Sequence, residues 1–185
     1  MVEVPRRTRH LGRAVIAGVV VVGVVVVGAI LAVGTATADP EVAAVRNLAA
    51  DTLILEHRIG VPDSPNAAAI MAAESARLHA DAEAKANARY KGPLLAMRIR
   101  QFNAAVDQAV TGRVSGLDGG AKDIVFGETT VGPDTATVHL RATTWATSSV
   151  NGKVTSPMST DNWTFFLQKV DGQWFVTDTE TDFHG

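Results

Sequence analysis

Beyond a continuous apolar run near the start of this chain, apolar residues recur first every three or four residues and later every second residue. After Asp39-Pro40, an N-cap residue followed by proline, the helical period predicts a first helix that ends at Gly60. Ser64-Pro65 repeats this start signal and predicts a second, alanine-rich helix that runs to about Tyr90. Residues 94–111 have the clearest apolar stripe, so we expect this third helix to be the main one packed on the core.

The later period of two predicts four strands, at 123–131, 135–148, 155–170 and 173–182. Asn151-Gly152 and Asp171-Gly172, which separate successive strands, are strong signals for tight hairpin turns. Ahead of the strands lies the stretch 111–122, in which five residues are glycine or aspartate, and this composition predicts a flexible loop. We therefore expect an α+β fold in which about three helices pack on a curved, four-stranded antiparallel sheet.

The two hairpin turns fix the register of the last three strands independently of each other. The predicted pairs are Leu140 with Trp163, Val138 with Phe165, Leu167 with Val176, and Phe165 with Asp178. Both turns place the same residues on one inward face, namely Val138, Leu140, Trp163, Phe165, Leu167, Trp174 and Val176. A slip of one residue in either turn would destroy this agreement, so we expect this face to pack on the third helix.

The opposite face of the predicted sheet is more aromatic than a purely solvated face. Trp145, Phe166 and Phe175 fall there, with Arg141 and His139 beside them as a polar rim. We interpret these five residues as a candidate surface for a protein partner or for a second copy of the chain. The alternative is that another part of the chain folds over them.

Charge is distributed unevenly at the start of the chain. Residues 1–13 contain four arginines, whereas residues 14–38 contain no charged side chain. This pattern predicts a cytoplasmic basic end, a transmembrane anchor at 14–38 and an extracytoplasmic domain at 39–185. The alternative is a signal segment cleaved after Ala38 and a secreted domain, because Ala36-Thr37-Ala38 fits the small-x-small cleavage pattern.

Composition and missing motifs exclude several kinds of chemistry. The chain has no cysteine, which excludes disulfides, thiolate metal sites and thiol nucleophiles. Residues 39–185 carry 13 basic and 18 acidic side chains, a balance of 13 − 18 = −5, which disfavours nucleic acid as a partner. No histidine-based metal motif and no nucleophile motif is found, so we expect no catalytic residue, metal or cofactor.

Residues 163–178, Trp-Thr-Phe-Phe-Leu-Gln-Lys-Val-Asp-Gly-Gln-Trp-Phe-Val-Thr-Asp, form a hairpin motif after three predicted helices. This order resembles the cone-shaped α+β fold of the nuclear transport factor two-like superfamily. With the basic end and apolar segment in front, the chain is similar to the Mce-associated membrane proteins of actinobacteria. It is more distantly similar to inner-membrane assembly subunits of conjugation machines.

Members of that superfamily include enzymes, which hold acid/base residues inside the cone. By the predicted register, Asp161, Asp178 and Glu180 share the inward face near one end of the sheet. Paired carboxylates in a half-apolar site can act as acid and base, so these residues are the alternative candidate pocket. The competing interpretation is that the strands leave the core here and the acids are solvated.

Two classes of function follow from these patterns. The first is a non-catalytic, membrane-tethered interaction or accessory domain of a bacterial cell-envelope assembly. The alternative is an isomerase-like enzyme, or a binder of small molecules, that uses the interior of the cone. The sequence favours the first class, because it shows no catalytic constellation.

Overall fold

The structure, a computed structural model, describes residues 39–58, 74–111 and 114–182. The predicted basic end, the segment 14–38 and the predicted helix start at Ser64-Pro65 lie outside these ranges. Within them, no helix is both long and apolar enough to cross a membrane.

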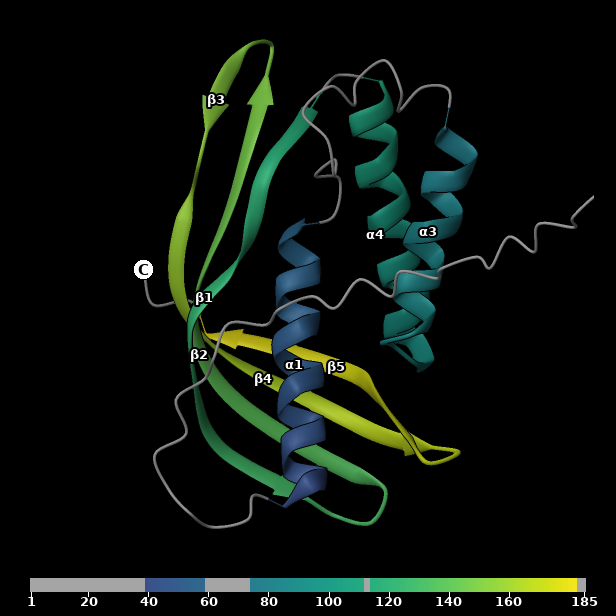
Figure 1. Cartoon of the computed structure of the whole chain (residues 1–185), viewed down its shortest axis with the longest axis vertical. Helices are drawn as coiled ribbons and strands as arrows, with labels where there is room; N and C mark the ends of the chain where they lie inside the picture. The colour runs from purple at the N-terminus through teal and green to yellow at the C-terminus, as the bar shows by residue number, and fades with distance from the viewer. Residues whose placement is uncertain (1–38, 59–73, 112–113, 183–185) are drawn as a thin grey trace, which may run out of the picture. The chain divides into compact units, whose positions relative to one another are not determined.

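Helices come first in the chain and strands follow (Figure 1). The helices are α1 (Pro40–Arg58), α3 (Ser75–Asn87) and α4 (Gly92–Val110). The strands are β1 (Val114–Val131), β2 (Thr135–Val150), β3 (Lys153–Thr155), β4 (Met158–Val170) and β5 (Gln173–Asp182). The predicted α+β class, with helices on an antiparallel sheet, is confirmed.

The start of α1 is set by its capping residue, as the sequence predicted. The Glu41 backbone N–H donates to the Asp39 Oδ1 atom at 2.9 Å, and Pro40 occupies the first helical position. Of the second predicted helix, the described residues contain α3, which ends at Asn87, so Tyr90 lies beyond its end. Tyr90 instead forms a parallel bridge with Val176 of β5, which ties the start of α4 to the sheet.

The sheet is antiparallel throughout, with the strand order β1-β2-β4-β5 and with β3 also paired to β2. Both hairpin turns have positive φ at their two central residues, 52° and 77° at Asn151-Gly152 and 51° and 79° at Asp171-Gly172. This conformation matches the twist of the flanking strands. Three of the predicted pairs are confirmed: Leu140 with Trp163, Val138 with Phe165, and Leu167 with Val176.

The fourth predicted pair, Phe165 with Asp178, is wrong. The register of β4 against β5 shifts between Leu167 and Phe166, so Phe166 pairs with Asp178 and Phe165 with Thr179. Thr177 is the extra residue of this β-bulge, and its hydroxyl donates to the Phe166 carbonyl at 3.2 Å. Because one added residue reverses the side-chain alternation, every residue of β5 after the bulge points to the opposite face from the one predicted.

The glycine-rich stretch is strand rather than loop from Val114 onward, so the predicted loop at 111–122 is wrong there. A Cβ atom on Gly119 would lie 1.8 Å from the backbone oxygen of His57. The last turn of α1 therefore packs directly on the backbone of β1, which only glycine permits at this position. Gly119 therefore allows close packing of α1 and β1.

The helix that lies against the curved sheet is α1, whereas α4 pairs with α3 and touches β1 and β5 at its side (Figure 1). This corrects the expectation that the helix at 94–111 is the main one on the core. Four residues of α1 are fully buried: Val45, Ala49, Thr52 and Leu53. The apolar stripe of α4, which includes Phe102, contacts both α3 and the sheet. Because only part of the stripe faces the sheet, α4 is not the main helix packed on it.

Candidate functional site

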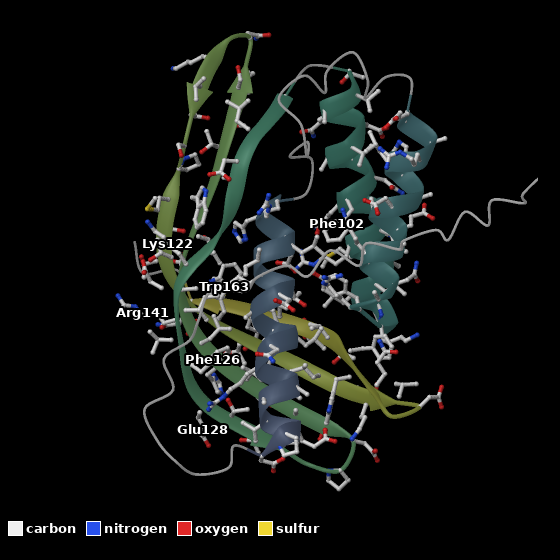
Figure 2. The ribbon with its side chains drawn as sticks, in the orientation of Figure 1. Phe102, Lys122, Phe126, Glu128, Arg141 and Trp163 are labelled. Carbon is white, nitrogen blue, oxygen red and sulfur yellow. The ribbon has the colours of Figure 1, made fainter. Side chains whose placement is uncertain are left out.

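The two faces of the sheet differ in character, as the register predicted. Phe126 and Trp163 lie on the α1 side, and Lys122 and Arg141 lie on the opposite side, which we call the outward face (Figure 2). On the inward face, Val138, Leu140, Phe165, Leu167, Trp174 and Val176 are buried and Trp163 packs against them.

The predicted aromatic residues of the outward face do not form one patch. Trp145 pairs with Met158, whereas Phe166 pairs with Thr137, eight positions away from Trp145 along β2. At ~3.3 Å per residue this spacing separates them by about 26 Å. Phe175 is only 6% exposed, and the Lys91 Nζ atom lies 4.5 Å from the centre of its ring.

Arg141 and His139 are exposed on β2 between these two aromatic positions. The His139 Nδ1 atom lies 3.0 Å from the Thr164 hydroxyl on the neighbouring strand. Arg141 pairs in register with Val125 on one side and with Asn162 on the other. These side chains therefore occupy the middle of the outward face rather than the rim of a single aromatic patch.

The Trp145 side chain is held by contacts with Asp118 and Gly120 of β1. Its Nε1 atom donates to the Asp118 Oδ2 atom at 3.0 Å, and this hydrogen bond, with one from the Gly119 N–H, lowers the pKa of Asp118. The six-membered ring lies over Gly120, where a Cβ atom would be 3.1 Å from the Trp145 Cη2 atom. No pattern along the chain indicated this contact, because Asp118 and Gly120 fall in the predicted loop.

The three candidate pocket acids are not brought together. Asp161 is 3% exposed on the inward face, and its Oδ2 atom has no hydrogen-bond partner among the described residues. Asp178 and Glu180 are exposed. The bulge at Thr177 turns them to the outward face, because they follow it along β5.

A different polar cluster links α1 to the rest of the interior. The Glu56 Oε1 atom accepts hydrogen bonds from the Tyr90 hydroxyl at 2.6 Å and from the Arg98 Nη2 atom at 2.8 Å. The same Arg98 atom also lies 3.3 Å from the Thr179 hydroxyl on β5. The Glu56 and Arg98 side chains are 10% and 15% exposed, so this cluster is largely buried.

Burial dominates the electrostatics of this cluster. It raises the pKa of Glu56 above its ordinary value, although Arg98 and the Tyr90 hydroxyl act in the opposite direction. Burial, and then the nearby Glu56 carboxylate, also raise the pKa of Tyr90. This cluster is not marked by any motif in the sequence. The only signal was that Glu56 follows Thr52, the polar member of the α1 stripe, by one helical turn.

A second polar contact holds the other end of α1 against the sheet. The Glu41 carboxylate accepts from the Lys169 Nζ atom at 2.7 Å and from the Trp174 Nε1 atom at 2.6 Å. These two donors, Lys169 first, lower the pKa of Glu41. Across the described ranges, no three His, Asp or Glu side chains lie together in a way that could hold a metal ion.

The fold resembles that of the intermembrane-space region of the chloroplast protein ARC6, with a TM-score of 0.55 and 12% sequence identity. The superposition covers 76% of this chain and 95% of that one, and at this identity the likeness extends to the fold alone. An NTF2-like transpeptidase from Campylobacter jejuni superposes with a TM-score of 0.26, 18% identity, and coverage of 61% of this chain and 98% of that one. A protein of unknown function from Mycobacterium tuberculosis superposes with a TM-score of 0.27 and 19% sequence identity. That superposition covers 44% of this chain and 46% of the other. No protein-family model and no curated protein matches the sequence.

Proposed function

We propose that this chain is a non-catalytic, membrane-tethered accessory domain that lies outside the cytoplasm and binds a protein partner in a bacterial cell envelope. The observation that carries the proposal is the apolar, buried inward face of the sheet. Buried Phe165 and Leu167 occupy the face on which an enzyme of this architecture would need a site, and Glu56 is already held by two donors. The outward face, by contrast, presents Arg141 and His139 to solvent.

The proposed location rests on the sequence and on one structural likeness. Four arginines precede an uncharged run of 25 residues, 14–38, which is long enough to span a bilayer. The ARC6 region of similar fold is an intermembrane-space region of a chloroplast protein, and this likeness supports a location outside the cytoplasm. The order of segments supports a nuclear transport factor two-like domain similar to the Mce-associated membrane proteins.

Co-purification from solubilised membranes tests this function. The chain should copurify with a stoichiometric protein partner, and Arg141→Glu together with His139→Glu should abolish the association without changing the melting temperature. Arg100→Glu, which makes the same reversal of charge on the exposed side of α4, is the matched control. A chain that stays monomeric and without partner under mild cross-linking would contradict the proposal.

One observation favours the alternative, a site for small molecules. The buried Asp161 carboxylate has an Oδ2 atom without a partner among the described residues, and burying such an oxygen is costly. Asp161→Asn separates the two functions. If the variant folds normally but loses the cellular role while keeping its protein partner, the enzyme or binder replaces the accessory domain as the better proposal.

A further inference from the structure

The far end of the outward face carries an aromatic surface that we call the Trp145 platform. It consists of Trp145, its cross-strand neighbour Met158, and Asp118, Gly120 and Lys122 on β1. Trp145 is half-buried, Met158 is 57% exposed, and the Lys122 Nζ atom lies 5.9 Å from the centre of a Trp145 ring. The platform belongs to neither the interior cluster nor the Arg141 region.

The indole of Trp145 is held down on the sheet. The hydrogen bond from its Nε1 atom to Asp118 fixes one edge, and Gly120 leaves room for the six-membered ring to lie over the β1 backbone. A tryptophan that anchors a protein interface usually fills a desolvated pocket of the partner. Trp145 cannot project in this way without breaking its contact with Asp118.

Beside the Asp118 and Lys122 side chains of β1, the segment of β2, β3 and β4 around the platform has little charge and is rich in hydroxyl groups. Nine of the 18 residues from 143 to 160 are Ser or Thr, and Lys153 is the only charged one. A surface designed for solubility carries about 25–35% charged residues, so solubility alone does not explain this composition. The hydroxyls already form cross-strand pairs, such as Thr143 with Thr160 at 2.9 Å and Thr147 with Ser156 at 2.7 Å.

The area of this surface also argues against a protein partner. Three strands about 4.8 Å apart over roughly 25 Å of length present about 360 Å². A standard protein interface needs about 800 Å² from each partner. A ligand that is flat, neutral and narrow fits the platform better than a second folded domain.

We propose that the Trp145 platform binds a neutral polysaccharide. The apolar C–H face of a sugar ring would stack on the indole and Met158, while its hydroxyls donate to the Asp118 carboxylate and accept from the Lys122 ammonium group. A neutral polymer matches a surface on which Asp118 and Lys122 have opposite charges and residues 143–160 carry one charged side chain, Lys153. This inference rests on the geometry of the platform and does not require the protein partner proposed above.

Affinity gel electrophoresis tests the inference with the full-length chain. Native gels would contain dextran, mannan or hydroxyethyl cellulose, and the detergent must not be a glycoside, because its headgroup would compete. At least one of these polymers should retard the wild-type chain. Trp145→Ala should weaken the retardation about tenfold, whereas Trp145→Phe should retain part of it, because a ring still stacks.

Asp118→Ala and Val125→Thr make the test independent of folding. Asp118 is exposed, so its replacement should leave the melting temperature unchanged but weaken retardation, since it removes the acceptor and frees the indole. Val125→Thr alters the same face away from the platform and should behave as the wild-type chain does.

Two results would overturn the polysaccharide proposal. One is a wild-type chain that none of the three polymers retards; the other is retardation that survives both Trp145→Ala and Asp118→Ala. A photo-reactive side chain in place of Thr143 tests the competing partner. If it captures a protein in intact cells while the gels show no retardation, the platform is a protein interface.

Discussion

Glu56 shows how a single buried carboxylate connects several elements of this protein. It lies on α1 and accepts hydrogen bonds from Tyr90, ahead of α4, and from Arg98 within α4. A buried ion pair gains attraction but loses the hydration of both charges, so its net contribution to stability is small. Removing only one partner is different, because the other charge then stays buried without compensation.

Arg98→Met should therefore destabilise the fold strongly. At pH 7 we expect a loss of about 3–5 kcal/mol in the free energy of unfolding, since Glu56 would stay buried without its cation. Chemical denaturation with circular dichroism measures this loss. The loss should be smaller at pH 4, where Glu56 can take up a proton. A loss that is equal at both pH values would show that Arg98 acts through packing alone.

Glu56→Gln should reveal the raised pKa of Glu56 through the pH dependence of stability. A carboxyl group whose pKa is raised on folding contributes stability below its unfolded pKa, 4.5, and loses this contribution as the pH rises through the folded pKa. Glutamine keeps an oxygen that can accept from Tyr90 and Arg98 but does not ionise. Relative to the wild-type chain, the variant should gain stability between pH 4 and pH 8 in denaturation curves. A relative loss over this range would contradict the direction of the shift.

At the scale of the elements, the contact of α1 with β1 depends on a glycine. Gly119→Ala would place a Cβ atom 1.8 Å from the His57 backbone oxygen, so helix and strand must move apart. We expect a loss of about 1–3 kcal/mol, measured by thermal unfolding. Gly127→Ala, on the same strand, is the matched control. Its Cβ atom would meet only the His139 side chain and backbone at 3.5 Å or more, so the melting temperature should hardly change.

The helices and the sheet also depend on each other through buried aromatic residues. Phe102 on α4 is 3% exposed and Phe165 on β4 is fully buried. Truncating either to alanine should decrease the free energy of unfolding by ~3–5 kcal/mol. If denaturation curves of both variants matched the wild-type curve, the described packing of helices on the sheet would be wrong.

At the scale of the whole molecule, the orientation across the membrane can be tested directly. The arginines of residues 1–13 predict that this end stays in the cytoplasm and that residues 39–185 lie outside. Protease added to intact spheroplasts should digest a tag placed after Gly185 and spare a cytoplasmic marker protein. Protection of that tag until the membrane is lysed would reverse the predicted orientation.

Local signals in the sequence determined a large part of this fold. Asn151-Gly152 and Asp171-Gly172 fixed their turns, because the required positive φ angles are properties of these residues themselves. These two turns also determined the pairs on the inward face, such as Leu140 with Trp163. Asp39 determined the start of α1 as its capping residue. Each of these features depends on neighbours along the chain or on simple alternation.

Only the tertiary structure decided the features that depend on distant residues. The bulge at Thr177 redirects Asp178 and Glu180, and no local pattern of the sequence marks it. The glycines of β1 resemble those of a loop until α1 packs on them at Gly119. Glu56 meets Arg98 across 42 residues of chain, 98 − 56, so their contact exists only once the helices have packed. The sequence by itself determined where the chain turns and which face is apolar, whereas contacts between distant segments decided which polar groups meet.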